Sequence, residues 1–213
     1  MATINAAQVK GMLMSVADRV IASKEMLCDA DRNIGDGDHG IGMAKGFEAA
    51  RRELMARDFT DVYTVFSTVG RTMIREMGGA SGIIFGLLFY AGAKNQQPKE
   101  EVNTQEFTEV FEKALNEIQL KGQAKPGDKT IVDGLVPMVD VMKSCSAIDG
   151  NFKTLLSEAL AAAEIGKENS KKYVARYGKA KTLGDRSIGF PDPGCVSLVI
   201  IANAMFEWAQ ENL

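Results

Sequence analysis

The chain has 213 residues, 46% of them hydrophobic, so it can bury a sizeable core without disulfides or structural metals. A formal charge of −3, with no basic patch interleaved with aromatics, argues against nucleic acid as a partner. Three widely spaced cysteines and an N-terminus without a basic segment followed by an apolar run favour a reducing, cytoplasmic setting without a signal peptide.

Apolar residues recur at helical spacing from the first segment onward, where Val9, Met12, Val16 and Val20 fall on one face. Sustained strand alternation is missing. The apolar run 83–93 is too short to cross a bilayer and indicates a buried helix, so no membrane contact is expected. We predict an all-α fold, a single domain over 1–213 built as an eight-helix antiparallel up-and-down bundle or barrel. The helices are expected near 4–27, 40–57, 60–77, 81–95, 104–121, 133–148, 152–176 and 194–211.

Pro137 lies early in the sixth of these helices, which therefore either starts later than residue 133 or kinks there.

The connections between these helices fall into two kinds. Those after the second, fourth and sixth helices are ordinary polar turns. Those after the odd-numbered helices are rich in glycine and charge, and they read DADRNIGDGDHG (29–40), GGASG (78–82), KGQAKPGDKT (121–130) and YGKAKTLGDRSIGFPDPG (177–194). Successive helices of an up-and-down bundle alternate in direction, so these four loops should share one end. That end is predicted to be a binding site.

The residue types of these loops suit a magnesium–nucleotide complex. Three loops run directly into a helix, whose N-terminus offers unpaired N–H groups and a positive dipole to phosphate. Asp31, Asp36 and Asp38 supply the hard oxygen ligands that Mg²⁺ prefers. Side chains that could neutralise the remaining phosphate charge are Lys129, Lys179 and Arg186.

Simpler interpretations exist for each motif. Asp36 or Asp38 could merely cap the next helix, which explains one of three carboxylates. His39, the only histidine, could be an ordinary satisfied side chain, and a role in contact or orientation is favoured over one in chemistry. GGASG could simply end one helix and permit a tight turn. The joint placement of the loops favours the binding site.

Two familiar loop motifs are excluded. An EF-hand starting at Asp29 would need glycine sixth and glutamate twelfth, where the chain has Ile34 and Gly40. Gly122 and Gly127 have the P-loop spacing, but Asp128 separates the second glycine from the lysine, and a helix precedes the loop instead of a strand.

With these motifs in order, the chain resembles the nucleotide-binding L subunit of bacterial dihydroxyacetone kinases, equivalent to the C-terminal domain of single-chain ATP-dependent kinases. The resemblance covers about residues 10–210 and rests on IGDGDHG (34–40), GGASG (78–82), PGDKT with Asp133 following, and LGDRSIGFPDPG (183–194). It implies an eight-helix barrel with ADP or ATP across one end. It also implies two magnesium ions held by residues matching Asp31, Asp36 and Asp38.

The same resemblance implies the nucleotide contacts and the partners. It implies no catalytic residue on this chain. The ketose would sit on a separate K subunit, and in the phosphotransferase-system version a phosphohistidine on an M subunit would rephosphorylate bound ADP. Residues expected to line the nucleotide site are His39, Gly40, Ile41, Gly42, Ala80, Ser81, Gly122, Thr130, Ile131, Lys179, Asp192, Pro193 and Gly194.

One loop departs from the commoner family pattern. Residues 178–190 read GKAKTLGDRSIGF where GRASYLGERSIGH is more usual, so Lys179 replaces an arginine and lacks its bidentate fork. Lys181, Thr182 and Phe190 are further departures that bear on partner and substrate.

The expected function is therefore that of a glycerone-phosphotransferase subunit, which passes a phosphoryl group to a small ketose in glycerol metabolism. A chain without its own K domain mildly favours the phosphoenolpyruvate-dependent version. Alternatives are a ketotetrose kinase using exchangeable ATP and a nucleotide-state-dependent regulator of a transcription factor. A hydrolase acting alone would need His39 as its base and is disfavoured.

Overall fold

A computed structural model describes residues 2–148 and 150–213 and confirms the all-α prediction. Its elements, in chain order, are β1 (Thr3–Asn5), α1 (Ala6–Ala22), α2 (Lys24–Arg32), α3 (His39–Met55), α4 (Val62–Met77), α5 (Gly79–Tyr90), β2 (Glu101–Asn103), α6 (Thr104–Gly122), α7 (Val132–Ile148), α8 (Phe152–Ser170), the 3₁₀ helix η1 (Lys179–Ser187) and α9 (Pro193–Asn212).

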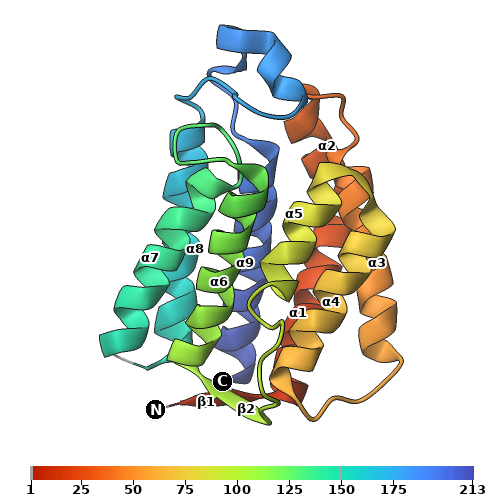
Figure 1. The fold of residues 1–213 in the computed structure, drawn as a ribbon, viewed down its shortest axis with the longest axis vertical. Helices are drawn as coiled ribbons and strands as arrows, with labels where there is room; N and C mark the ends of the chain where they lie inside the picture. Colours follow the sequence, from red (N-terminus) through yellow and green to blue (C-terminus); the bar gives the residue numbers. More distant parts are fainter. Residues whose placement is uncertain (1, 149) are drawn as a thin grey trace.

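The helices close into a barrel, because each packs against its neighbour in chain order and α9 returns to α1. Figure 1 shows them running along the long axis of the molecule, with η1 at one end and the strands and both termini at the other. Several aromatic rings pack against one another within a mainly aliphatic core. Phe66 packs edge-on against Phe111 at 6.2 Å, and Phe107 packs against Phe152 at 5.5 Å between ring centroids.

Side-chain caps start several helices close to the predicted boundaries. Asn5 and Asn103 each accept a hydrogen bond from the backbone N–H three residues on, and each forms a capping box with the side chain of that residue. Asp61 and Asn151 cap α4 and α8 by accepting hydrogen bonds from the backbone N–H groups two and three residues on, without a capping box. These local signals explain why most predicted helix boundaries lie within two residues of those observed.

Some boundaries differ from the prediction. The first helix was expected to end near residue 27, but after a break at Ser23 the chain stays helical to Arg32, so Asp31 lies on the last turn of α2. The seventh was expected to reach residue 176, but α8 ends at Ser170, whose carbonyl accepts a hydrogen bond from Lys129 Nζ at 2.7 Å. Helix α7 begins at Val132 and contains Pro137.

Two short elements carry no detectable sequence pattern. Strand β1 pairs antiparallel with β2, with Ile4 opposite Val102, and three residues are too few to show an alternation. Helix η1 lies within the loop expected at 177–194. No helix of the described residues is long and apolar enough to span a membrane.

Candidate functional site

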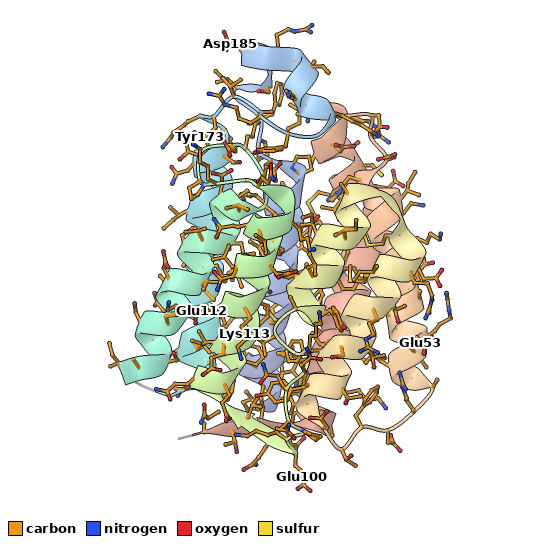
Figure 2. The ribbon with its side chains drawn as sticks, viewed as in Figure 1. Glu53, Glu100, Glu112, Lys113, Tyr173 and Asp185 are labelled. Carbon is orange, nitrogen blue, oxygen red and sulfur yellow. The ribbon has the colours of Figure 1, made fainter. Side chains whose placement is uncertain are left out.

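A cavity of about 660 Å³ lies at one end of the barrel and is lined by residues from all four of the glycine-rich connections. In Figure 2, Asp185 of η1 and Tyr173 mark this end of the molecule, and Glu100 marks the opposite one. The predicted convergence of these loops is confirmed. Alternating helix direction is its cause, since the connections after α2, α4, α6 and α8 all emerge at this end.

Three carboxylates gather on one side of the cavity. Asp31, Asp36 and Asp38 can each offer one oxygen, and these oxygens lie within 4.8 Å of one another. Asp31 also shapes the loop, because its Oδ2 accepts a hydrogen bond from the backbone N–H of Gly37 at 2.8 Å. A set of hard oxygens with open space beside it fits a divalent cation such as Mg²⁺, which binds to a few carboxylates and keeps further positions for phosphate or water.

Helix capping does not account for these acids. Asp38 stands at the N-cap position of α3, yet its side chain makes no capping hydrogen bond. Asp36 is exposed and pairs with Lys179, whose hydrogen bond lowers the pKa of the Asp36 carboxyl. Both carboxylates therefore face the cavity side with oxygens that a cation could use.

Two helix N-termini at the cavity have no side-chain cap. The N-cap residues of α3 and α5 make no side-chain capping hydrogen bond, although the N–H of His39 lies 3.4 Å from Asp31 Oδ2. Helix α9 is capped by Asp192, whose Oδ2 accepts from the N–H of Cys195 at 2.9 Å. Gly78 and Gly79, with φ of 69° and 61°, give α5 a start that residues with a side chain would find strained. Uncapped N–H groups and the helix dipole suit an anion at these two points.

His39 lines the cavity and is held there by neighbouring side chains. Its Nε2 lies 2.7 Å from Ser197 Oγ, and its ring packs near Phe85 at 5.8 Å between centroids. Burial lowers the pKa of His39 and so favours the neutral ring. The charges of Asp31 and Asp38 have a smaller, opposite effect. The side chain thus links the start of α3 to α9.

Lys129 is a buried lysine whose ammonium is hydrogen-bonded to backbone carbonyls. It is 2% exposed, and its ammonium donates to the carbonyls of Ser170 and Phe190 at 2.7 and 2.5 Å. Desolvation lowers its pKa, opposed by nearby Asp192. Lys129 also lines the cavity, so its predicted role toward phosphate stays a prediction, while its two hydrogen bonds hold the connection 171–192 onto the barrel.

Asp133, in the first turn of α7, shapes the neighbouring loop. Its carboxylate accepts hydrogen bonds from the N–H groups of Gly127 at 2.5 Å and Thr130 at 2.8 Å. These contacts place Thr130 and Ile131 on the cavity wall.

Comparison with known proteins assigns the chain that carries this cavity to a family. The model of the DAK2 domain matches residues 33–207, which include residues from all four loops. The chain belongs to the DAK2-domain family. It is 31% identical to the "PEP-dependent dihydroxyacetone kinase, ADP-binding subunit DhaL" of Escherichia coli (strain K12), over 98% of this chain and 100% of the relative. It is 33% identical to "PEP-dependent dihydroxyacetone kinase 1, ADP-binding subunit DhaL" of Listeria innocua, over 92% of each chain.

A solved structure shows the same fold. The dihydroxyacetone kinase of C. freundii in complex with AMP-PNP and Mg²⁺ superposes on this DAK2 domain with a TM-score of 0.72 at 23% identity. The match covers 97% of this chain and 35% of the other, so the chain spans about a third of that kinase.

Most residues predicted for the site line the cavity of this DAK2 domain. Gly122 is not among the residues that line the cavity. It lies beside one of them, because a Cβ at position 122 would lie 3.7 Å from the side chain of Ile84. Arg186 is exposed on η1 and also lies outside the lining. The predicted residues that line it are Asp31, Asp36, Asp38, His39, Ile41, Gly42, Ala80, Ser81, Lys129, Thr130, Ile131, Lys179, Asp192, Pro193 and Gly194.

Gly40 is buried beneath this surface. A Cβ at this position would lie 2.1 Å from the carbonyl oxygen of Lys24 and 2.8 Å from the nitrogen of Cys28. The glycine therefore permits α3 to pack closely on α2. By contrast, a Cβ at Gly42 would meet no atom within 4 Å.

Sequence reasoning missed two polar residues of the DAK2 cavity. Lys45 lines it from α3, one turn beyond Ile41, and helical spacing could have found it. Tyr177 lines it from the connection after α8 and donates its hydroxyl to the carbonyl of Gln123 at 2.8 Å. That contact joins two loops and has no local sequence signal.

Asp192 should make the stability of this DAK2 domain depend on pH. Burial raises the pKa of its carboxyl to about 7. The pKa of Asp192 is higher in the folded protein than in the unfolded chain, so folding favours the protonated carboxyl. The stability that this carboxyl contributes is full at low pH and is lost as the pH rises through 7. Asn also caps helices, so Asp192→Asn should fold without the pH-dependent loss. Its stability relative to wild type should increase by about 1–3 kcal/mol as the pH rises from 5 to 8.

Thermal melts of both proteins across this pH range measure the effect. Asp61→Asn makes the same change at the cap of α4 and serves as control. A stability difference between Asp192→Asn and wild type that stays constant from pH 5 to pH 8 contradicts the prediction.

Proposed function

We propose that this chain is the nucleotide-binding subunit of a kinase that phosphorylates a small ketose, with ADP or ATP and divalent cations held in the loop-end cavity. The observation that carries the proposal is the juxtaposition, in one cavity, of two uncapped helix N-termini and three clustered carboxylates. Its family relatives are named as ADP-binding subunits of dihydroxyacetone kinases, and the C. freundii kinase structure holds AMP-PNP and Mg²⁺.

Each part of the cavity then has a task. Asp31, Asp36 and Asp38 would hold the metal, for which we infer two ions. The N–H groups at the starts of α3 and α5 would donate to phosphate oxygens. When bound, divalent cations neutralise charge that spreads over the transferring phosphoryl oxygens.

The acceptor and its base would come from a partner. His39 contacts Ser197, and burial lowers its pKa, so the ring is a weak base. We therefore infer that a separate K subunit holds the ketose, and that a phosphohistidine-bearing M subunit supplies the phosphoryl group in a phosphoenolpyruvate-dependent system. We further propose that residues 1–213 act as one nucleotide-binding domain in the cytoplasm, in the service of glycerol metabolism.

Calorimetry with ADP tests the binding step. We expect uptake of ADP in magnesium buffer and a large loss of affinity in EDTA, because the carboxylates and the phosphates repel each other without the cation. Absence of ADP uptake in magnesium buffer would overturn the proposal.

Reconstitution with a ketose-binding subunit tests the chemistry. Retention of ADP through dialysis, with turnover driven by a phosphohistidine donor, supports the phosphoenolpyruvate-dependent version. Rapid exchange with ATP, or a preference for a ketotetrose over dihydroxyacetone, supports the alternative kinase.

A further inference from the structure

One lysine joins two loops of the cavity through its acids. The ammonium of Lys179, at the start of η1, contacts Asp36 Oδ2 and lies 3.4 Å from Asp38 Oδ2, across more than 140 residues of sequence. The side chains of the three residues are 59%, 48% and 67% exposed. This contact, open to solvent, ties η1 to the loop that precedes α3.

The same carboxylates are those expected to bind the metal. Mg²⁺ binds carboxylate oxygens directly, at about 2.0–2.1 Å, and demands near-octahedral geometry around itself. An ammonium that donates hydrogen bonds to these oxygens occupies the lone pairs that the cation needs, and the two positive charges repel each other. Lys179 in its observed position and a metal on Asp36 and Asp38 therefore compete.

Building on the proposed function, we propose that Lys179 is an exchangeable counter-ion of the metal site. It neutralises Asp36 and Asp38 before metal binds, and the arriving cation displaces it. Its ammonium, still at the edge of the cavity, is then available to phosphate oxygens. Metal loading is thereby coupled to release of η1 from the acid loop.

The chemistry of lysine suits this exchange. Exposed ion pairs are weak, so the contact can be broken by a divalent cation that binds the same carboxylates. The compact ammonium on a flexible stem can move from one anion to another, whereas an arginine would grip a carboxylate through two parallel hydrogen bonds. Lys179 should therefore bind to Asp36 and Asp38 less tightly than an arginine at this position would.

Titration of the full chain with Mn²⁺, without nucleotide, tests the competition. Lys179→Met should bind Mn²⁺ about three- to tenfold tighter than wild type, because the competing charge is removed. Lys179→Arg should bind it more weakly than wild type. The matched control is Lys181→Met, which removes the same charge from the same 3₁₀ helix at an exposed position outside the cavity lining and should change affinity by less than about twofold.

Hydrogen exchange of residues 178–187 gives a second readout. In wild type, Mn²⁺ or Mg²⁺ alone should speed exchange of this segment, because the tie to Asp36 is lost. In Lys179→Met the segment should exchange rapidly with or without the cation. Thermal melts check that the variants fold, and the exposure of Lys179 predicts that they do.

These outcomes separate this inference from the proposed function. If Lys179→Met and Lys181→Met bind Mn²⁺ equally and the wild-type protein takes up ADP, the counter-ion role alone is overturned. Tighter Mn²⁺ binding by Lys179→Met in a protein that takes up no ADP supports the counter-ion role and overturns the proposed nucleotide site.

Discussion

Asp36→Asn and Asp38→Asn are each expected to abolish phosphoryl transfer in the reconstituted complex while leaving the helical fold intact. Both side chains are exposed at the cavity, and neither makes a capping hydrogen bond that the fold requires. Loss of groups that merely orient a metal ligand costs 10- to 100-fold, so loss of a direct ligand should cost at least about a hundredfold in magnesium-dependent ADP affinity. Calorimetry with ADP and magnesium, and turnover of the complex, measure these effects.

Asp29→Asn is the matched control for these two variants. Asp29 belongs to the same acidic stretch, but it pairs with Arg32 and is not among the residues that line the cavity. Asp31 is a poorer test, because its carboxylate also accepts from Gly37 and so builds the loop. Turnover retained by Asp36→Asn and Asp38→Asn would refute their assignment as metal ligands.

Gly40→Ala and Gly42→Ala, two residues apart on α3, should have opposite effects on stability. A methyl at position 40 would collide with the backbone of α2, so Gly40→Ala should lose about 1–3 kcal/mol. A methyl at position 42 meets no atom within 4 Å and improves helix propensity, so Gly42→Ala should gain about 0.5–1 kcal/mol. Denaturant unfolding of both variants measures the difference.

The same pair separates packing from binding. Because Gly42 lines the cavity near the start of α3, its added methyl should hold phosphate away from the helix and weaken ADP binding by roughly tenfold. Gly40→Ala should affect ADP only through its loss of stability. A Gly42→Ala protein that is stabilised and binds ADP as wild type does would contradict the role of α3 as a phosphate site.

Much of the architecture could be predicted from local sequence. Apolar residues at helical spacing, as in Val9, Met12 and Val16, fix which face of a helix is buried, and all three are fully buried in the barrel. Polar residues such as Asn103 and Asn151 mark helix starts through their own backbone. Alternating helix direction then places the four glycine-rich loops at one end, so the location of the site followed without tertiary information.

What the individual side chains do was decided only by the tertiary structure. His39 meets Ser197 across 158 residues, and Lys129 binds the carbonyls of Ser170 and Phe190. Lys179 reaches the acids of a distant loop. None of these contacts has a periodic or local signal, because each depends on which helices become neighbours when the barrel closes. The sequence by itself thus determined the helices and the end at which the site lies, while packing decided which charges remain available there.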